Sequence, residues 1–118
     1  MGWRADFNMV PLNSTLNERN PSTTGSFEVS SQVAPDDACI FIQIASVGIT
    51  SHSIRVNDRE LPGEDLPGAP GGSHAWLTWM KPVPKGYLKG GSNKISVIRR
   101  GRDDFNVGTA FVFWREKD

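Results

Sequence analysis

The sequence predicts an all-β fold: an antiparallel β-sandwich of jelly-roll type with seven or eight strands. Three observations support this prediction. Short runs in which apolar and polar residues alternate recur along the chain, as in strands with one buried face. Turn-forming residues separate these runs at intervals of about 8–12 residues, a spacing typical of sandwiches and barrels. No stretch keeps the period near 3.6 residues that marks an amphipathic helix.

Bulk composition fits one ordinary globular domain. The chain has 118 residues, of which 37% are hydrophobic and 22% charged, as expected for a soluble protein. Thirteen basic residues balance thirteen acidic ones, and a nucleic-acid-binding protein would show a basic excess. No run approaches the ~20 apolar residues of a membrane span, and no signal peptide is recognisable. We therefore expect no nucleic-acid or membrane partner, and a cytoplasmic location by default.

The N-terminal quarter predicts one strand and a polar connection. Phe7 and Met9 alternate with polar residues, which predicts a short half-buried strand that Pro11 ends or confines to a sheet edge. Residues 13–25 are rich in Asn, Ser, Thr and Pro, which predicts a loop or a flexible arm. We divide the single domain accordingly into an N-terminal strand or arm with its loop, 1–25, and the β-sandwich, 26–118.

Two further strands should follow. Residues 26–33 alternate around Phe27 and Val29, and a turn is expected at Pro35-Asp36-Asp37 because proline pre-sets φ there. The most apolar run, 38–47, is rich in β-branched residues and should be a central strand. Its core face should carry Ile40, Ile42 and Ile44.

A hairpin and a long irregular loop come next. Residues 53–61 predict a hairpin in which Asn57 and Asp58 adopt positive φ, a region that their side chains tolerate. Residues 62–73 contain three prolines and four glycines, which nearly exclude regular structure. A loop of this length in a small domain is often functional.

The remaining sequence predicts the closing part of the sandwich. The stretch 75–99 reads as an aromatic strand, a proline-bounded crossing, a turn at Tyr87-Leu88, a glycine corner and a strand from Lys94. The last strand, 106–114, should lie inside a sheet because both of its faces are apolar near its end. One face should carry Val107, Thr109, Phe111 and Phe113, and the other Ala110, Val112 and Trp114.

Two segments, 54–61 and 83–97, resemble the galactose-binding-like β-sandwich superfamily, which supplies accessory domains to many glycoside hydrolases and polysaccharide lyases. The second segment follows that superfamily's Leu-x-x-Gly-x-Asn-x-Ile-x-Val pattern, with Ser92 between the glycine and the asparagine. In the first segment Asp58 stands where the pattern has glycine. The matching residues are Leu88, Gly91, Asn93, Ile95 and Val97. The resemblance implies a jelly-roll fold and favours glycan binding, and it transfers no ligand residue.

The pattern also has a local physical reading. Leu88 should fill the core where the chain crosses between sheets, and Gly90-Gly91 should form the corner. Asn93 should bond the backbone of that corner. These roles are structural, and the same fold carries unrelated functions.

Aromatic residues supply the first candidate site. Trp76, Trp79 and Tyr87 could stack on sugar rings, and His74 could hold a hydroxyl. Trp76 and Trp79 are three residues apart in a strand, so they should face opposite sides. Alternatively, a tryptophan packs beneath the Pro/Gly loop and His74 is an ordinary surface residue.

Charged residues supply the second candidate site. Arg100, Arg102 and Asp103 cluster with Arg99 and Asp104 between the last two strands. This cluster could bind a polar or anionic ligand, or it could simply solubilise a hairpin end.

Metal and nucleophile chemistry have little support in the sequence. The lone cysteine, Cys39, lies in an apolar run and should be a buried, inert thiol. Two isolated histidines do not give zinc spacing. No metal is expected, although Asp36-Asp37 or Asp103-Asp104 would suit structural calcium.

Catalytic motifs are also missing. No Ser/His/Asp spacing, nucleophile elbow or phosphate loop is present. A glycosidase pair drawn from Glu60, Glu64 or Asp65 stays open.

These observations favour a non-catalytic binding module that recognises carbohydrate through loop and aromatic residues. The alternative is a structural or assembly protein, such as a particle or phage component. Such a protein would oligomerise or dock a protein partner, with Trp3 and Phe7 of an N-terminal arm resting on a neighbour. A small enzyme is the third reading.

Overall fold

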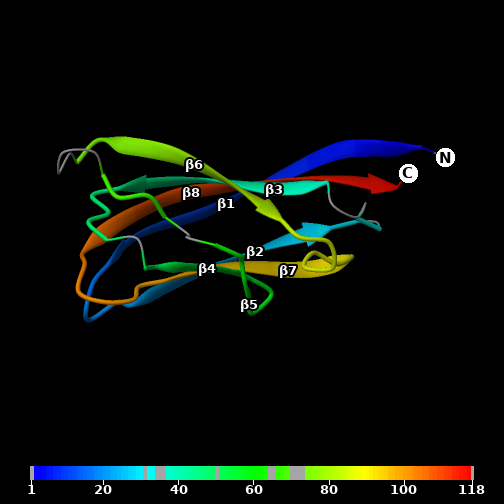
Figure 1. Cartoon of the computed structure of the whole chain (residues 1–118). Coiled ribbons are helices and arrows are strands. Elements are labelled where there is room, and N and C mark those ends of the chain that lie inside the picture. Colours follow the sequence, from blue (N-terminus) through cyan, green and yellow to red (C-terminus); the bar gives the residue numbers. More distant parts are fainter. Residues whose placement is uncertain are drawn as a thin grey trace.

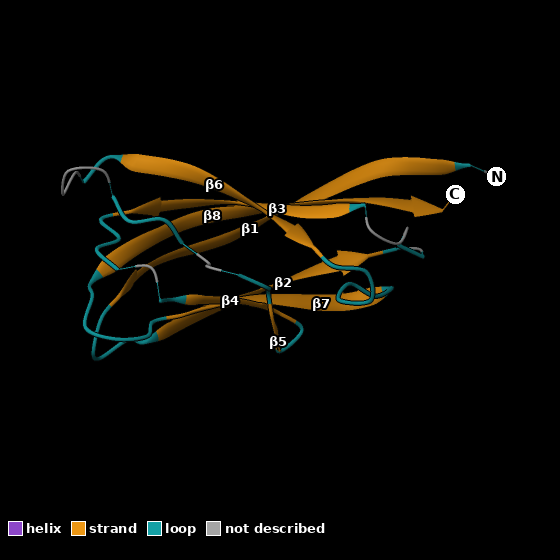
Figure 2. Ribbon diagram, in the orientation of Figure 1, coloured by secondary structure: helices purple, strands orange, loops and turns teal. Residues whose placement is uncertain are grey.

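The computed structural model describes residues 2–30, 32–33, 37–49, 51–63, 66–69 and 74–117. Eight strands form two four-stranded antiparallel sheets packed face to face, and Figures 1 and 2 show the two layers. The predicted β-sandwich is therefore confirmed. The described residues include no helix that could span a membrane.

The first sheet has the strand order β1-β8-β3-β6. β1 (Trp3–Leu16) and β6 (Trp76–Val83) form its edges, and β8 (Phe105–Lys117) and β3 (Ala38–Ala45) lie between them. The predicted central position of the Ile40–Ile44 run and the internal position of the last strand are both confirmed. Both edge strands carry a proline, Pro11 and Pro82, as edges tolerate.

The second sheet has the order β2-β7-β4-β5. It comprises β2 (Ser22–Val29), β7 (Gly91–Ile98), β4 (Ser53–Val56) and β5 (Arg59–Glu60). The predicted β4–β5 hairpin is confirmed, with φ of 52° at Asn57 and 66° at Asp58.

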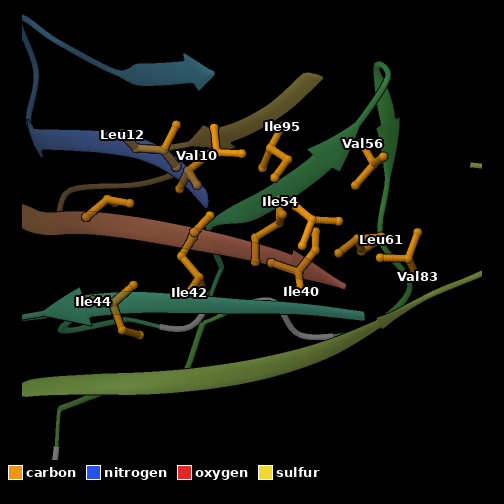
Figure 3. Packing of buried hydrophobic residues seen from close by; sticks show 14 of the residues in the cluster. Val10, Leu12, Ile40, Ile42, Ile44, Ile54, Val56, Leu61, Val83 and Ile95 are labelled. Atoms are coloured by element: carbon orange, nitrogen blue, oxygen red, sulfur yellow. The ribbon is translucent and has the colours of Figure 1, made fainter. Parts of the chain in front are cut away.

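The inward faces of the sheets form one hydrophobic core. Ile40, Ile42 and Ile44 are fully buried on β3, and Figure 3 shows Ile40 and Ile42 beside Ile54 of the second sheet. A buried core of aliphatic side chains is the main stabilising feature of such a sandwich.

The predicted corner between β6 and β7 is confirmed in detail. Leu88 is buried in the core, and Gly91 has φ of 88°. The Asn93 side chain accepts from Lys89 N (3.0 Å) and donates to Lys89 O (2.8 Å) and Gly91 O (3.1 Å). Asn93 therefore holds the chain as it passes from one sheet to the other.

Three element predictions are corrected by the structure. The loop expected over 13–25 is confined to 17–21, because β1 extends to Leu16 and β2 begins at Ser22. The strand expected over 26–33 ends at Val29, beyond which Val33 makes one isolated bridge to Glu116. Alternation alone missed the polar start of β2, whose Ser and Thr residues pair with β7.

A bulge accounts for the third correction. Val107 was expected on the same face as Thr109, yet it is buried in the core. The pairing of β8 with β3 shifts between Ile42 and Ile44, so an extra residue of β8 is accommodated there. The turn predicted at Pro35-Asp36 lies outside the described residues.

Candidate functional site

Two loops meet at one end of the sandwich and enclose a polar cleft. The loops are 17–21, between β1 and β2, and 99–104, between β7 and β8; Figure 1 shows them together at its left. The cleft has a volume of about 840 Å³. A smaller hollow of about 310 Å³, bordered by Asn17 and Arg19, adjoins it. The main cleft is lined by Glu18, Arg99, Arg102, Asp103 and Asp104.

The first loop is a tight turn stabilised by Asn17. Its side-chain Oδ1 accepts from the N–H groups of Arg19 and Asn20, both at 3.0 Å. Backbone bonds of 3.1 Å join Asn17 and Asn20 in both directions. This turn fixes the backbone and leaves the Glu18 side chain exposed at the cleft.

The second loop is fastened by Arg99. Its backbone N–H donates to Pro21 O at 2.7 Å, which ties the two loops together. Its Nε donates to Asp103 O at 2.6 Å, and its Nη2 lies 3.6 Å from Asp104 Oδ1. The guanidinium therefore binds groups of its own loop. Only 15% of the Arg99 side chain is exposed.

Asp103 and His52 form a buried clamp behind the cleft. The Asp103 carboxylate accepts from Gly48 N (2.9 Å), Ile49 N (3.2 Å) and His52 Nε2 (2.7 Å). His52 Nδ1 accepts from Arg100 N at 3.0 Å, so the proton of a neutral ring belongs on Nε2. The ring also stacks on Phe105, with centroids 4.1 Å apart. Asp103 is thus engaged in holding loops rather than facing a ligand.

Sequence reasoning missed the part that His52 plays here. The two residues are 51 positions apart, and no local spacing pattern joins them. The sequence offered Asp103 only as a member of the charged cluster between the last two strands, as a possible ligand contact.

Two charged side chains in the lining of the cleft are exposed to solvent. Glu18 and Arg102 are exposed, and within the described residues neither has a hydrogen-bond or ion-pair partner. A carboxylate accepts hydrogen bonds and a guanidinium donates them. Because both line one cleft, they suit a ligand that carries both donors and acceptors, such as a polyhydroxyl compound.

His74 and Trp76 lie at the same end of the molecule as the cleft. Strand pairing places Trp76 opposite Ala45 of β3, and Ala45 opposite Asn106 of β8, two residues beyond Asp104. Trp76 is 58% exposed, and a Cβ added to Gly108 would lie 3.3 Å from its ring. His74 Nδ1 is 2.7 Å from Ser46 Oγ.

Trp79 lies on the other face of β6, as the spacing predicted. It pairs with Ile42, whereas Trp76 pairs with Ala45. Because β6 is an edge strand, Trp79 still remains 39% exposed. Neither tryptophan is therefore buried beneath the Pro/Gly loop.

Tyr87 and Arg100 lie away from the cleft. Tyr87 Oη donates to Glu60 O at 3.0 Å, and the guanidinium of Arg59 lies 4.1 Å from the centre of its ring. Arg100 bonds Ser53 Oγ at 3.3 Å and Glu60 Oε1 at 3.2 Å. The seven candidate residues are thus divided among the cleft with its clamp, strand β6, and the β5 side of the second sheet.

Metal and nucleophile sites gain no support from the described residues. Within them, no three His, Cys, Asp or Glu side chains gather as metal ligands. Glu60 is paired with Arg100, and Glu64 and Asp65 lie outside the described residues. Cys39 is half-buried rather than buried, and desolvation raises the pKa of its thiol, which disfavours the reactive thiolate.

Comparison with known proteins identifies the family to which the chain belongs. A model of a family of unknown function, DUF7383, matches residues 4–116. The chain belongs to DUF7383. No curated protein matches its sequence.

Solved structures similar to this DUF7383 chain include carbohydrate-binding modules. One is a family 35 module from an environmental isolate, with a TM-score of 0.58 and 24% identity over 77% of this chain and 64% of that one. Another is the family 35 module of Paenibacillus barcinonensis, with a TM-score of 0.56 and 12% identity over 95% and 98%. The galactose-binding-like resemblance is therefore confirmed as a fold.

The same fold also occurs in a different setting. The chain aligns along its full length with 28% of a chain in the complex of Aeromonas sobria serine protease and its chaperone, with a TM-score of 0.66 and 7% identity. At these identities the likeness shows the fold alone, and function has to be argued from the site.

Proposed function

We propose that this DUF7383 chain is a non-catalytic module that binds carbohydrate at the end of the sandwich where the cleft opens. The observation that carries the proposal is that one cleft holds a carboxylate, Glu18, and a guanidinium, Arg102, neither of which has a partner among the described residues. Glu18 would accept hydrogen bonds from sugar hydroxyls, and Arg102 would donate to hydroxyl or ring oxygens. The similarity to carbohydrate-binding modules supports the same ligand class.

An exposed aromatic ring at the same end completes the proposed site. β6 is two strand spacings from β8 in the first sheet, or roughly 10 Å. An oligosaccharide of a few residues would therefore reach from the cleft to Trp76. The ring would stack on the apolar C–H face of a sugar, while the cleft would hold its hydroxyls.

Glycan-array screening followed by calorimetry tests this proposal. We expect the wild-type chain to bind at least one glycan, and Trp76→Ala and Arg102→Ala each to weaken binding about tenfold or more, equivalent to ~1.4 kcal/mol. Glu18→Gln should act in the same direction because the amide accepts fewer hydrogen bonds.

Matched controls are available at sites away from the cleft. Trp3→Ala removes an exposed tryptophan near the other end of the first sheet, Lys85→Ala an exposed cation, and Glu28→Gln an exposed carboxylate. These three variants should bind as the wild type does. Absence of binding to every glycan, or equal losses in the control variants, would overturn the proposal.

A further inference from the structure

The outer face of the first sheet is unusually apolar. Strand pairing aligns Phe7 with Phe113 and Met9 with Phe111, then Phe111 with Phe41 and Phe41 with Met80. These residues alternate with core residues along their strands, so they point away from the core. We call this surface the outer aromatic face; it comprises Phe7, Met9, Phe41, Met80, Phe111 and Phe113, with Trp3 at one end. The outward side chains of Gln43, Thr78 and Thr109 separate it from Trp76.

The side chains of this face contact one another. Phe7 and Phe113 stack with ring centroids 5.7 Å apart, and Phe41 meets Phe113 edge-on at 5.4 Å. Phe7, Met9 and Met80 nevertheless remain 55%, 56% and 49% exposed. The face is therefore a continuous apolar surface and not a set of scattered residues.

The second sheet shows what an outer face usually looks like. Its outward positions on β2 and β7 are polar apart from Ile98, namely Ser22, Thr24, Ser26, Glu28, Ser92, Lys94 and Ser96. An antiparallel sheet with one face in the core normally presents such a polar face to water. Only the first sheet departs from this pattern.

The exposed area of the face fits a protein interface. An aromatic side chain buries 150–250 Å² when covered, so the exposed fractions given above and those of Trp3, Phe41 and Phe113 amount to on the order of 550 Å². The largest apolar patch on a typical monomer is about 300–600 Å², and a standard interface takes ~800 Å² from each partner. The face lies at the upper end of the monomer range and would supply about two-thirds of one partner's share of a standard interface, so a second layer of protein is the occupant that we infer.

We propose that a second copy of this chain covers the outer aromatic face, giving a two-fold symmetric dimer in which two first sheets pack face to face. The charges of the face favour this occupant. Its centre carries none, and Arg115 and Lys117 are both at one end of β8. A two-fold axis across the strands runs the two β8 strands antiparallel, so the cationic ends lie apart and the apolar centres of the two faces meet.

Sedimentation equilibrium and light scattering over a range of concentrations test the dimer. The wild-type mass should rise to that of two chains, and Phe7→Glu and Met80→Glu, at opposite edges of the face, should each raise the dissociation constant at least tenfold. Ser26→Glu places the same charge on the exposed polar face of the second sheet and should leave the dimer unchanged. Circular dichroism verifies that each variant is folded.

Cys39 supplies a second readout, because it pairs with Phe113 on the same face. Alkylation of its thiol should slow as the wild-type protein is concentrated, and it should not slow in Phe7→Glu. The proposal is overturned if the wild type stays monomeric up to millimolar concentration, or if Ser26→Glu disrupts the dimer as strongly as Phe7→Glu. Both results are independent of glycan binding.

Discussion

The carboxylate of Asp103 receives hydrogen bonds from two backbone N–H groups and from the His52 ring, and it is almost fully buried. Removing it leaves three donors without an acceptor at the end of the sandwich. His52 is buried, whereas Gly48 and Ile49 are exposed, and a buried donor left unsatisfied is costly. This one side chain therefore stabilises the position of two loops, chiefly through its bond with His52. The sequence pointed to Asp103 as a loop residue, and its partner could not be found because the bond spans 51 positions.

Asp103→Ala should lower the free energy of unfolding by about 2–3 kcal/mol, because hydrogen bonds to a charged acceptor are lost and the buried His52 donor is left without a partner. Urea denaturation measures this loss. Asp104→Ala is the matched control: its carboxylate is 73% exposed and lies 3.6 Å from Arg99, so its removal should cost less than ~1 kcal/mol. Equal losses in the two variants would contradict the clamp.

Asp6 makes the stability of the folded protein depend on pH in the acid range. A hydrogen bond with the Glu116 side chain, followed by the 2.8 Å bond from Phe7 N, holds the pKa of Asp6 below its ordinary value of 3.8. The folded state therefore favours the ionised form. The stabilisation is complete above the ordinary value and is lost as pH falls through the lower pKa of the folded protein.

Urea midpoints measured between about pH 5 and pH 2 test this dependence. Asp6→Asn should be less stable than the wild type at the upper end, and the difference should shrink as the pH falls. Two curves that descend in parallel would show that Asp6 contributes no such dependence.

At the scale of elements, the close approach of β1 and β2 depends on Gly25. A Cβ at this position would collide with Cγ1 of Val10 and lie 3.0 Å from Cδ2 of Leu12. The sequence placed Gly25 in a loop, because the whole segment 13–25 is rich in Asn, Ser, Thr and Pro. By contrast, the β4–β5 hairpin and the Asn93 corner were predicted well, because their signals are local turn residues.

Gly25→Ala should therefore lower the free energy of unfolding by about 1–3 kcal/mol through overpacking. Val10→Ala alone should also destabilise the protein, by leaving a cavity. The double variant should be more stable than the sum of the two losses predicts, because the new methyl group occupies the space that Val10 vacates. Simple additivity in urea denaturation would argue against a steric cause.

At the scale of the whole molecule, the sequence predicted the two-layered sandwich but not what lies on its outside. Alternation identifies which residues share a face, and the β8 pattern predicted apolar residues on both faces. It does not reveal whether the second face is covered, which is why Phe111 and Phe113 suggested only an internal strand. The cleft was equally beyond prediction, because Glu18 joins Arg102 only after β1 and β8 have paired.

The molecule is elongated, with extents of 49 × 25 × 22 Å, and β1 and β8 run along its length in opposite directions. Trp3 pairs with Lys117 at one end, and Leu16 pairs with Phe105 at the other, beside the cleft. Figure 1 shows both termini on the side away from the loops 17–21 and 99–104. A fluorophore, an affinity tag or a surface linker joined at either terminus would therefore leave the cleft pointing outward, so an immobilised chain would display its loops to the solution.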